Sequence, residues 1–333
     1  MAGGILITGG AGFLGSALAA ALGRGQRVVL LDALCHDPVQ QRRRAALLGA
    51  ELIEADVADR AALERALDGC ARVVHLASLA GVERVCADPV ATMRTLLLGS
   101  SALLDACRER PGIERVLLVS SSEVYGPRAD RPPEEAVAAP LPAGEPRWSY
   151  AAAKLAAEHL ALAHQRSAGL PVCVLRPFNV YGPGQLGAGA VRIFAERALA
   201  GRPLAIRGDG RQLRAWCHVD DLVAGLRAAL FAEAAVGRVY NLGNPAAQAT
   251  VRALAERIVA LAGSTSRLVH VAPAAAEVSH RVPDIARARR ELGFAPRIEL
   301  DRGLRHTLDW LRCGRADAPG PPPAAGEDPC APS

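Results

Sequence analysis

Short apolar runs alternate with amphipathic segments through the first half of the chain. Each apolar run has the length and composition of a buried strand, and each is followed by a turn and a segment with helical character. Strands that alternate with helices in this way predict an α/β fold with a parallel sheet and right-handed crossovers. The predicted strands are residues 4–8, 27–31, 51–55, 73–76, 116–119 and 171–175.

Glycines interrupt the pattern directly after the first predicted strand. Gly9, Gly12 and Gly15 have the spacing G-x-x-G-x-x-G, and the helix-forming segment 16–22 follows them. Glycines allow a tight turn and a close backbone approach, and the N–H groups of the helix N-terminus can bind a pyrophosphate. A glycine pattern between a strand and a helix therefore predicts a dinucleotide site.

Acidic residues follow the second and third predicted strands. Asp32 lies 20 residues after Gly12, where a carboxylate can hydrogen-bond both ribose hydroxyls and repel a 2′-phosphate. We therefore expect NAD rather than NADP, the alternative being an ordinary aspartate at a strand end. Asp56 and Val57 stand where the adenine amine would bind.

The pattern loosens after the sixth predicted strand, which indicates a smaller lobe. Residues 204–210 predict a hairpin at its edge, and residues 214–221 lead into a further helix, where His218 is expected to be structural.

These patterns predict two units and a tail. Residues 1–176 are expected to form mainly a Rossmann-type, doubly wound NAD-binding domain, and residues 177–312 mainly a C-terminal α/β substrate lobe. One strand and one helix within about 214–243 should return to the main sheet. Residues 313–333, rich in Pro, Gly and Ala, are expected to be disordered.

Lysine is almost absent from the chain. Of the 39 Lys and Arg residues 38 are Arg, and Lys154 is the single lysine. An ammonium group has a tunable pKa, whereas arginine keeps its proton. Tyr150 stands four residues earlier, on the same face of the helix predicted for 150–165. A nearby Lys⁺ would lower the pKa of Tyr150 and let it take a proton from a sugar hydroxyl. A chance Y-x-x-x-K on a surface helix is the alternative.

Further polar residues follow the later strands. Hydroxyls in Ser120–Ser122 would point into the ligand crevice, because they follow the carboxyl end of a parallel strand; mere capping of the turn is the alternative. Residues 127–148 predict a loop over the site. Asn179 is a candidate ligand contact, whereas a turn role is expected for Asn241 and Asn244.

Composition limits the classes of ligand and partner that the protein can bind. The net charge of +5 comes from scattered arginines and aromatic residues are few, which argues against nucleic-acid binding. Mild basicity suits an anionic small ligand, and the guanidinium groups of Arg214 and Arg281 could clamp a diphosphate. The eight cysteines form no C-x-x-C and none pairs with His at ligand spacing, so we expect free thiols in a reducing cytosol and no metal site. We expect no leader and no segment able to span a membrane.

Ordered motifs between residues 4 and 312 together resemble the extended short-chain dehydrogenase/reductase family, specifically its NAD-dependent sugar-nucleotide epimerases, dehydratases and decarboxylases. The motifs are T-G-G-A-G-F-L-G at 8–15, H-L-A-S at 75–78, S-S-S-E-V-Y-G at 120–126, Y-A-A-A-K at 150–154, R-P-F-N-V-Y-G-P at 176–183, R-A-W-C-H-V-D at 214–220 and N-L-G at 241–243. The resemblance places near the cofactor Phe13, Leu14, Leu76, Ala77 and Ser78.

The resemblance implies a mechanism that begins at C4 of a nucleotide sugar. Tyr150 would take the C4 hydroxyl proton, the C4 hydrogen would pass to tightly held NAD, and a 4-keto sugar would result. Lys154 would hold the nicotinamide ribose, and Ser121 would hydrogen-bond the reacting hydroxyl. Asn179, Arg214 and Arg281 match the family's diphosphate contacts.

Glu123 distinguishes the branches of the family. The resemblance associates Ser122-Glu123 with glucuronate decarboxylases, Asp-Glu with 4,6-dehydratases, and a small or hydroxyl residue with 4-epimerases. Arg147-Trp148 and Arg281-x-Pro-Asp284 also resemble decarboxylases, whereas the loop at 182–186 does not. Leu96 replaces a common asparagine. A glutamate that is merely salt-bridged to an arginine is the alternative for Glu123.

Four hypotheses about the function stay open at this point. We favour decarboxylation of a UDP-glucuronate type of substrate, or dehydration; a UDP-sugar 4-epimerase is the alternative, and a non-catalytic NAD-binding regulator or an NADPH-dependent reductase is more distant. The family resemblance implies a homodimer. The helix face that carries Leu155, His159 and Leu162 fits a dimer contact or the protein's own core equally well. A cytoplasmic location is expected.

Overall fold

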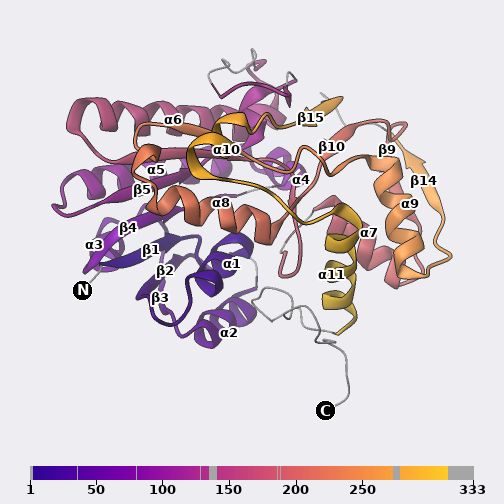
Figure 1. Ribbon diagram of the computed structural model, residues 1–333, viewed down its shortest axis with the longest axis horizontal. Coiled ribbons are helices and arrows are strands. Elements are labelled where there is room, and N and C mark those ends of the chain that lie inside the picture. Colours follow the sequence, from indigo (N-terminus) through magenta and orange to yellow (C-terminus); the bar gives the residue numbers. More distant parts are fainter. Residues whose placement is uncertain are drawn as a thin grey trace.

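A parallel sheet of seven strands, in the order β12-β7-β5-β4-β1-β2-β3, organises the residues that the structure describes (Figure 1). The computed structural model describes residues 3–35, 37–79, 81–127, 129–134, 141–185, 187, 189–272 and 278–313. Strands β1 and β2 are buried along their whole length, as is typical of parallel strands covered on both faces. The strands are β1 (Gly4–Thr8), β2 (Val28–Asp32), β3 (Glu51–Glu54), β4 (Cys70–His75), β5 (Arg115–Val119), β7 (Val172–Pro177) and β12 (Val239–Leu242).

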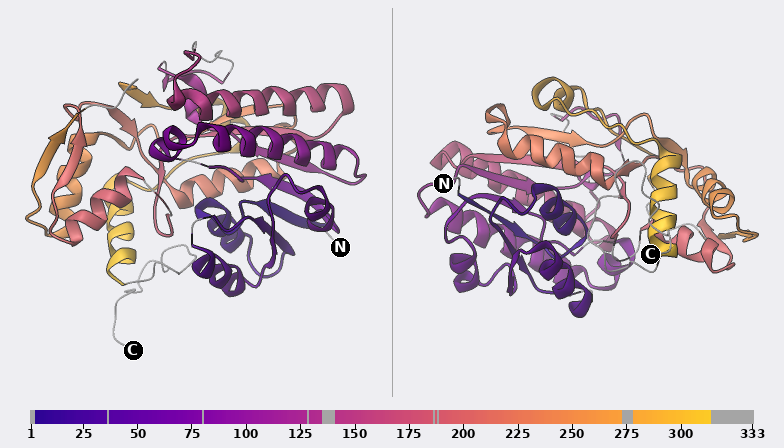
Figure 2. Two further views of the ribbon diagram at one scale, coloured as in Figure 1. Left: turned by 180° about the vertical axis from the view of Figure 1, so that it is seen from behind. Right: turned by 60° about the horizontal axis from the view of Figure 1, so that its bottom comes forward.

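Helices cover both faces of this sheet, which confirms the predicted doubly wound α/β fold (Figures 1 and 2). One face packs against α3 (Arg60–Ala66), α5 (Pro89–Arg108) and α6 (Ser149–Ala168). The other packs against α1 (Phe13–Leu22), α2 (Pro38–Leu48), α8 (Val219–Phe231) and α10 (Ala286–Leu292). The short helix α4 (Val82–Ala87) lies between β4 and α5.

The predicted strands are present; the first agrees at both ends, and the ends of the others differ by at most three residues. The largest shift is in β4, which begins at Cys70 rather than at residue 73. A charged residue, Arg72, hid the start of this strand in the sequence. Its guanidinium lies 5.0 Å from the centre of the Phe231 ring and pairs with Glu114, the residue before β5. The charge is therefore accommodated within a strand.

Smaller sheets and three helices form a lobe beside the main sheet (Figures 1 and 2). The predicted hairpin at 204–210 is wrong, because β9 pairs in parallel with β14. A parallel pair needs a crossover connection, which here includes α9. The elements not yet named, in the lobe and elsewhere, are β6 (Ala129–Asp130), β8 (Val180–Tyr181), β9 (Leu204–Arg207), β10 (Leu213–Ala215), β11 (Cys217–His218), β13 (Gln248–Thr250), β14 (Leu268–Val271), β15 (His280–Val282), α7 (Ala190–Leu199), α9 (Val251–Ala262) and α11 (Leu300–Arg312), with the 3₁₀ turns η1 (Ser122–Tyr125), η2 (Pro146–Trp148) and η3 (Glu233–Ala235).

The segment that follows β11 rejoins the main sheet. Helix α8 packs against the sheet face that α1 also covers, and β12 pairs in parallel with β7 at the end of the sheet. The division of the chain into an NAD-binding domain and a substrate lobe stays a prediction.

Helix α5 contradicts the expectation that no segment could span a membrane. It is 20 residues long, and its most apolar 18-residue window has a mean hydropathy of 1.2. The helix packs against α3 and α6, and 44 % of that window is buried. Val90 and Leu98 on the same helix are exposed. The homodimer, the absence of a membrane partner and the cytoplasmic location stay predictions.

Six cysteines of the described residues are free thiols, namely Cys35, Cys70, Cys86, Cys107, Cys173 and Cys217. The expectation of free thiols is wrong for Cys313, which is disulfide-bonded. The disordered tail was predicted from residue 313, but Cys313 directly follows α11, and residues 314–333 lie outside the described residues.

Candidate active site

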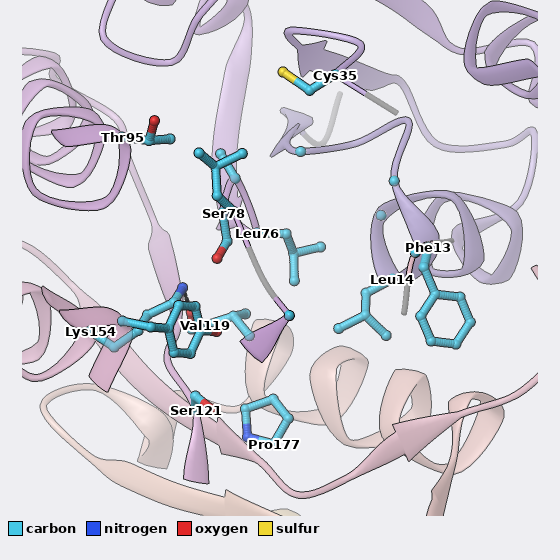
Figure 3. Close-up of a pocket in the computed structure, with 18 of the residues that line it drawn as sticks. Phe13, Leu14, Cys35, Leu76, Ser78, Thr95, Val119, Ser121, Lys154 and Pro177 are labelled. Atoms are coloured by element: carbon cyan, nitrogen blue, oxygen red, sulfur yellow. Dashed lines mark hydrogen bonds between the residues drawn. The ribbon is translucent and has the colours of Figure 1, made fainter. Parts of the chain in front are cut away.

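A cavity of about 600 Å³ lies at the carboxyl ends of the central strands. The chain order of the strands reverses between β1 and β4, and open α/β sheets bind their ligands at such a point. Figure 3 shows one end of the cavity lined by Lys154, Val119, Ser121 and Pro177, its α1 side by Phe13 and Leu14, and its other end by Cys35.

The cavity brings together nearly all of the residues singled out in the sequence. Arg214 is the one predicted site residue that does not line it among the described residues. The predicted residues that line it are Gly9, Gly12, Phe13, Leu14, Gly15, Asp32, Asp56, Val57, Leu76, Ala77, Ser78, Ser121, Ser122, Glu123, Tyr150, Lys154, Asn179 and Arg281.

The turn after β1 fits a dinucleotide. A Cβ atom on Gly15 would lie 2.5 Å from the Gly9 carbonyl oxygen and 2.6 Å from the Gly10 Cα, so only glycine allows α1 to pack this tightly on the turn. This packing places the first turn of α1 on the cavity wall, and its N–H groups are available for a pyrophosphate.

Asp32 ends β2 with its carboxylate at the cavity. One carboxylate oxygen accepts a hydrogen bond from the Ala11 N–H at 3.0 Å and the other from the Leu34 N–H at 2.8 Å, so the side chain is held in place. A fixed buried carboxylate can accept from a ribose diol and repels a 2′-phosphate. The residues at this end of the cavity therefore fit NAD.

Lys154 is buried and lines the cavity. Its Nζ donates a hydrogen bond to the Val119 carbonyl oxygen at 2.7 Å and lies 5.9 Å from the centre of the Tyr150 ring. Burial lowers the pKa of Lys154 to about 8, and the charge of Glu158 one turn later only partly opposes this.

The predicted lowering of the pKa of Tyr150 is wrong for this structure. Burial raises the pKa of the phenol, the charge of Glu123 raises it further, and the hydroxyls of Ser78 and Ser121 only partly oppose the increase. Because Lys154 is directed at a backbone carbonyl, it is too far away to reverse the effect of burial.

Glu123 lies between two arginines. One of its oxygens accepts from Arg281 Nη1 at 2.6 Å and the other from Arg147 Nη2 at 3.4 Å. Burial alone would raise the pKa of Glu123, but the charges of Arg281 and Arg147 outweigh it and hold the pKa below its ordinary value. Glu123 is therefore ionised at neutral pH, and the salt-bridged alternative is what the structure shows.

Two of the three predicted diphosphate contacts have other partners. The Asn179 amide donates to the carbonyl oxygens of Ala215 at 2.9 Å and Arg281 at 3.4 Å, although the residue lines the cavity. The Arg214 guanidinium donates to backbone carbonyl oxygens of the segment before β15, among them that of Val278 at 2.7 Å. Strand pairing places Arg214 beside Arg281, but only Arg281 reaches the cavity.

Comparison with known proteins agrees with this site. Residues 5–243 match the NAD dependent epimerase/dehydratase family. A dTDP-glucose 4,6-dehydratase of Streptomyces niveus is 32 % identical over 94 % of this chain and 94 % of its own. UDP-glucuronic acid decarboxylase 1 of Arabidopsis thaliana is 36 % identical over 92 % of this chain and 69 % of its own. A UDP-glucuronic acid 4-epimerase of Bacillus cereus, solved with UDP-glucuronic acid and NAD, superimposes with a TM-score of 0.85 at 28 % identity, covering 92 % of this chain and 98 % of its own.

The chain belongs to the NAD-dependent epimerase/dehydratase family. It is an enzyme of the sugar-nucleotide epimerase, dehydratase and decarboxylase group, and NAD is its cofactor. Two of the alternatives considered for the sequence, a non-catalytic regulator and an NADPH-dependent reductase, are therefore excluded.

An ion pair beneath the site of this epimerase/dehydratase was not anticipated from the sequence. Glu158 on α6 accepts from Arg176 on β7 through both oxygens, and both side chains are buried. Arg176 also donates to the Tyr125 hydroxyl at 2.7 Å, which donates to Asn241 at 2.8 Å. The turn role expected for Asn241 is therefore wrong, because it lies within β12 and completes this network; the rarity of Asn in the chain was the available signal.

Asn244 and His218 have the structural roles that the sequence predicted for them. Asn244 forms a turn, accepting from the Ala246 N–H at 3.1 Å. His218 is buried, accepts from the Asp220 N–H at the start of α8, and does not line the cavity among the described residues.

The single lysine permits a direct test of its environment. Protein labelled with ¹³C-lysine should give one side-chain signal in the NAD-free form, and its midpoint should lie near pH 8 rather than at 10.5. Since the unfolded chain then binds more protons between pH 8 and 10.5, the free energy of unfolding should rise with pH across that window. A midpoint at or above pH 10 would contradict the described burial of Lys154.

Proposed function

We propose that this enzyme oxidises C4 of a nucleotide-diphosphate sugar that carries a carboxylate on C5, and that the 4-keto product loses this carboxylate as CO₂. One observation carries the proposal. Arg281 is only 7 % exposed at the cavity wall, and its Nε and Nη2 have no hydrogen-bond partner among the described residues. Buried donors of this kind need an acceptor, and the side-on pair Nε–Nη2 matches the two oxygens of a carboxylate.

Glu123 supports the same assignment by orienting this guanidinium. Its ion pair occupies Arg281 Nη1 and leaves Nε and Nη2, on the opposite edge of the fork, without a hydrogen-bond partner among the described residues. We therefore assign Glu123 as a positioning residue. Arg147 adds a second positive charge beside it, which favours an anionic sugar.

The proposed reaction needs no reactant beyond one proton from solvent, which replaces the carboxylate on C5. Tyr150, in its ionised form, takes the proton of the C4 hydroxyl, with Ser121 placed to hydrogen-bond the same oxygen. NAD, when bound, supplies the oxidant that takes the C4 hydrogen with its electron pair and later returns it. The C4 ketone then stands β to the carboxylate, so the C5–C6 bond can break with its electrons moving into a C4 enolate. CO₂ leaves, one proton adds to C5, and C4 is reduced again.

Dehydration is supported less well by the side chains at this position. Loss of a C6 hydroxyl needs an acid beside it, but Ser122 is not acidic and Glu123 is held ionised by two arginines. Epimerisation at C4 is the stronger alternative, because a uronate can be bound without losing its carboxyl group, as the name of the Bacillus cereus relative implies for that protein.

Product mass separates these outcomes. The enzyme should be incubated with NAD⁺ and, separately, UDP-glucuronate, UDP-glucose and dTDP-glucose. Loss of CO₂ from UDP-glucuronate is expected. An unchanged mass with a new sugar configuration by NMR would make the enzyme an epimerase, and loss of water from a glucose nucleotide would make it a dehydratase; either result contradicts the proposal.

Replacing Glu123 by Gln should lower kcat for the uronate by about 100-fold, because the Arg281 fork loses its fixed orientation while the shape of the site is kept. KM should change less than tenfold, since the positive charge remains. Steady-state kinetics with NAD saturation and a melting curve measure both effects. Glu145→Gln, an exposed residue before η2, is the control and should change neither. Full turnover by Glu123→Gln would refute the assigned role.

A further inference from the structure

A tight turn after β8 is held by arginines from two different helices. The Gln185 N–H donates to the Gly182 carbonyl oxygen at 3.3 Å, and Gly184 has a φ of 82°, which favours glycine. Arg44, fully buried on α2, donates through Nη1 to the Gly184 carbonyl oxygen at 3.2 Å. Arg192 on α7 donates to the next carbonyl oxygen, that of Gln185. Consecutive carbonyl groups are thus fixed from both sides of the turn.

This anchoring places the Gln185 side chain at the cavity. Its Nε2 donates to the Val180 carbonyl oxygen at 3.4 Å. Because a carbonyl oxygen can only accept, the amide nitrogen must be the atom that faces it, and the amide oxygen takes the other position. That oxygen, Oε1, is buried and has no hydrogen-bond partner among the described residues.

We propose that Gln185 binds a ligand hydroxyl through Oε1, and that Arg192 acts as the positioning residue that holds it there. The proposal deepens the proposed function and rests on NAD and a nucleotide sugar sharing this cavity. It adds a binding residue that the sequence motifs did not indicate.

The chemistry of the amide oxygen selects the class of ligand group. A carbonyl oxygen accepts hydrogen bonds and repels diphosphate and carboxylate oxygens, so these anionic parts of either ligand do not suit it. Hydroxyl groups do, and they occur on the riboses of NAD and on the nucleotide sugar. Leaving such a buried acceptor without a donor is costly, so binding of the correct hydroxyl should depend on it.

The test compares the wild-type enzyme with Gln185→Met, which keeps the length of the side chain and removes the acceptor. Calorimetric titrations measure binding of NAD to the cofactor-free protein, and of UDP-glucuronate and UDP-glucose to the NAD-loaded protein. We expect affinity for one of the two ligand classes to fall about tenfold, while the other is unchanged and the melting temperature is retained. The class that weakens identifies the source of the hydroxyl.

Unchanged affinity for both classes in Gln185→Met would overturn the proposal. This outcome is independent of the reaction catalysed, because product identity is not measured. An enzyme that epimerises UDP-glucuronate without losing CO₂ would refute the proposed decarboxylation and leave the binding result standing.

A double-mutant cycle tests the positioning role of Arg192. Arg192→Gln should weaken the same ligand as Gln185→Met, and the double variant should be hardly weaker than Gln185→Met alone, because both changes remove one contact. Arg197→Gln is the matched control: Arg197 lies on the same helix and also donates to a backbone carbonyl, but that of Pro203, which is outside the turn that carries Gln185. Additive losses for Gln185 and Arg192, or an equal loss in the control, would refute the positioning role.

Discussion

Replacing Tyr150 by Phe is expected to lower kcat by a factor of about 10²–10⁴, while the affinities for NAD and for the nucleotide sugar stay within a few-fold. Phenylalanine keeps the ring on the cavity wall and removes only the oxygen that accepts the C4 hydroxyl proton. The loss should therefore appear in turnover and not in binding. Single-turnover kinetics at saturating NAD⁺ measure the oxidation step directly.

The control for this variant is the same substitution at Tyr240, in strand β12 of the sheet. The Tyr240 hydroxyl donates to Glu291 at 2.9 Å and does not line the cavity among the described residues. Tyr240→Phe should leave kcat unchanged. If Tyr150→Phe keeps more than a tenth of wild-type turnover, another group must serve as the base, and the proposed mechanism is wrong.

Replacing Glu158 by Gln is expected to destabilise the fold by about 3–5 kcal/mol, because it leaves the Arg176 guanidinium charged, buried and without its counter-ion. Three hydrogen bonds join the two side chains, at 2.6, 2.9 and 3.2 Å, and neither residue is more than 6 % exposed. Burial would lower the pKa of Arg176, but its bonds and ion pair with Glu158 raise it, so the arginine cannot escape the penalty by losing its proton.

Urea unfolding followed by circular dichroism measures this effect. Glu256→Gln is the control, because Glu256 pairs with Arg252 at the surface and should contribute little. A second readout is available at Lys154. The charge of Glu158 partly opposes the lowering of its pKa by burial, so the ¹³C midpoint of Lys154 should move to still lower pH in Glu158→Gln. Wild-type stability in this variant would show that the ion pair is replaced by other contacts at no net cost.

The consequences of this ion pair reach the active site through helix α6. Glu158 lies one turn after Lys154, and Arg176 stands on β7 one residue before the cavity-lining Pro177. The pair therefore fixes the helix that carries Tyr150 against the strand that forms the cavity floor. Because α6 carries Tyr150 and Lys154, a variant in which the ion pair between Glu158 and Arg176 is weakened should have reduced turnover even where the protein stays folded.

Local patterns were sufficient to predict much of this enzyme. The apolar runs predicted the strands because both faces of a parallel sheet are covered, and β1 and β2 are buried throughout. The glycines after β1 and the aspartate that ends β2 depend on backbone geometry within one βαβ unit. Tyr150 and Lys154 share one helix face. All these features arise within about 30 residues of chain, the range over which sequence spacing translates into geometry.

The tertiary structure alone decided which distant groups meet. Glu123 and Arg281 are 158 residues apart, and their ion pair changes Glu123 from a candidate acid into an ionised partner of Arg281. The parallel pairing of β9 with β14 and the burial of Asn241 likewise depend on segments remote in the chain.

Sequence by itself determined the fold class, because hydrophobic periodicity and glycine spacing act locally, and the resemblance of its ordered motifs indicated the family and many of the residues that line the cavity. It could not determine the direction of the Tyr150 pKa or the distance of Arg214 from the cavity. Those depend on burial and on which charges the packed elements bring together, and burial and charge contacts exist only once the chain has folded.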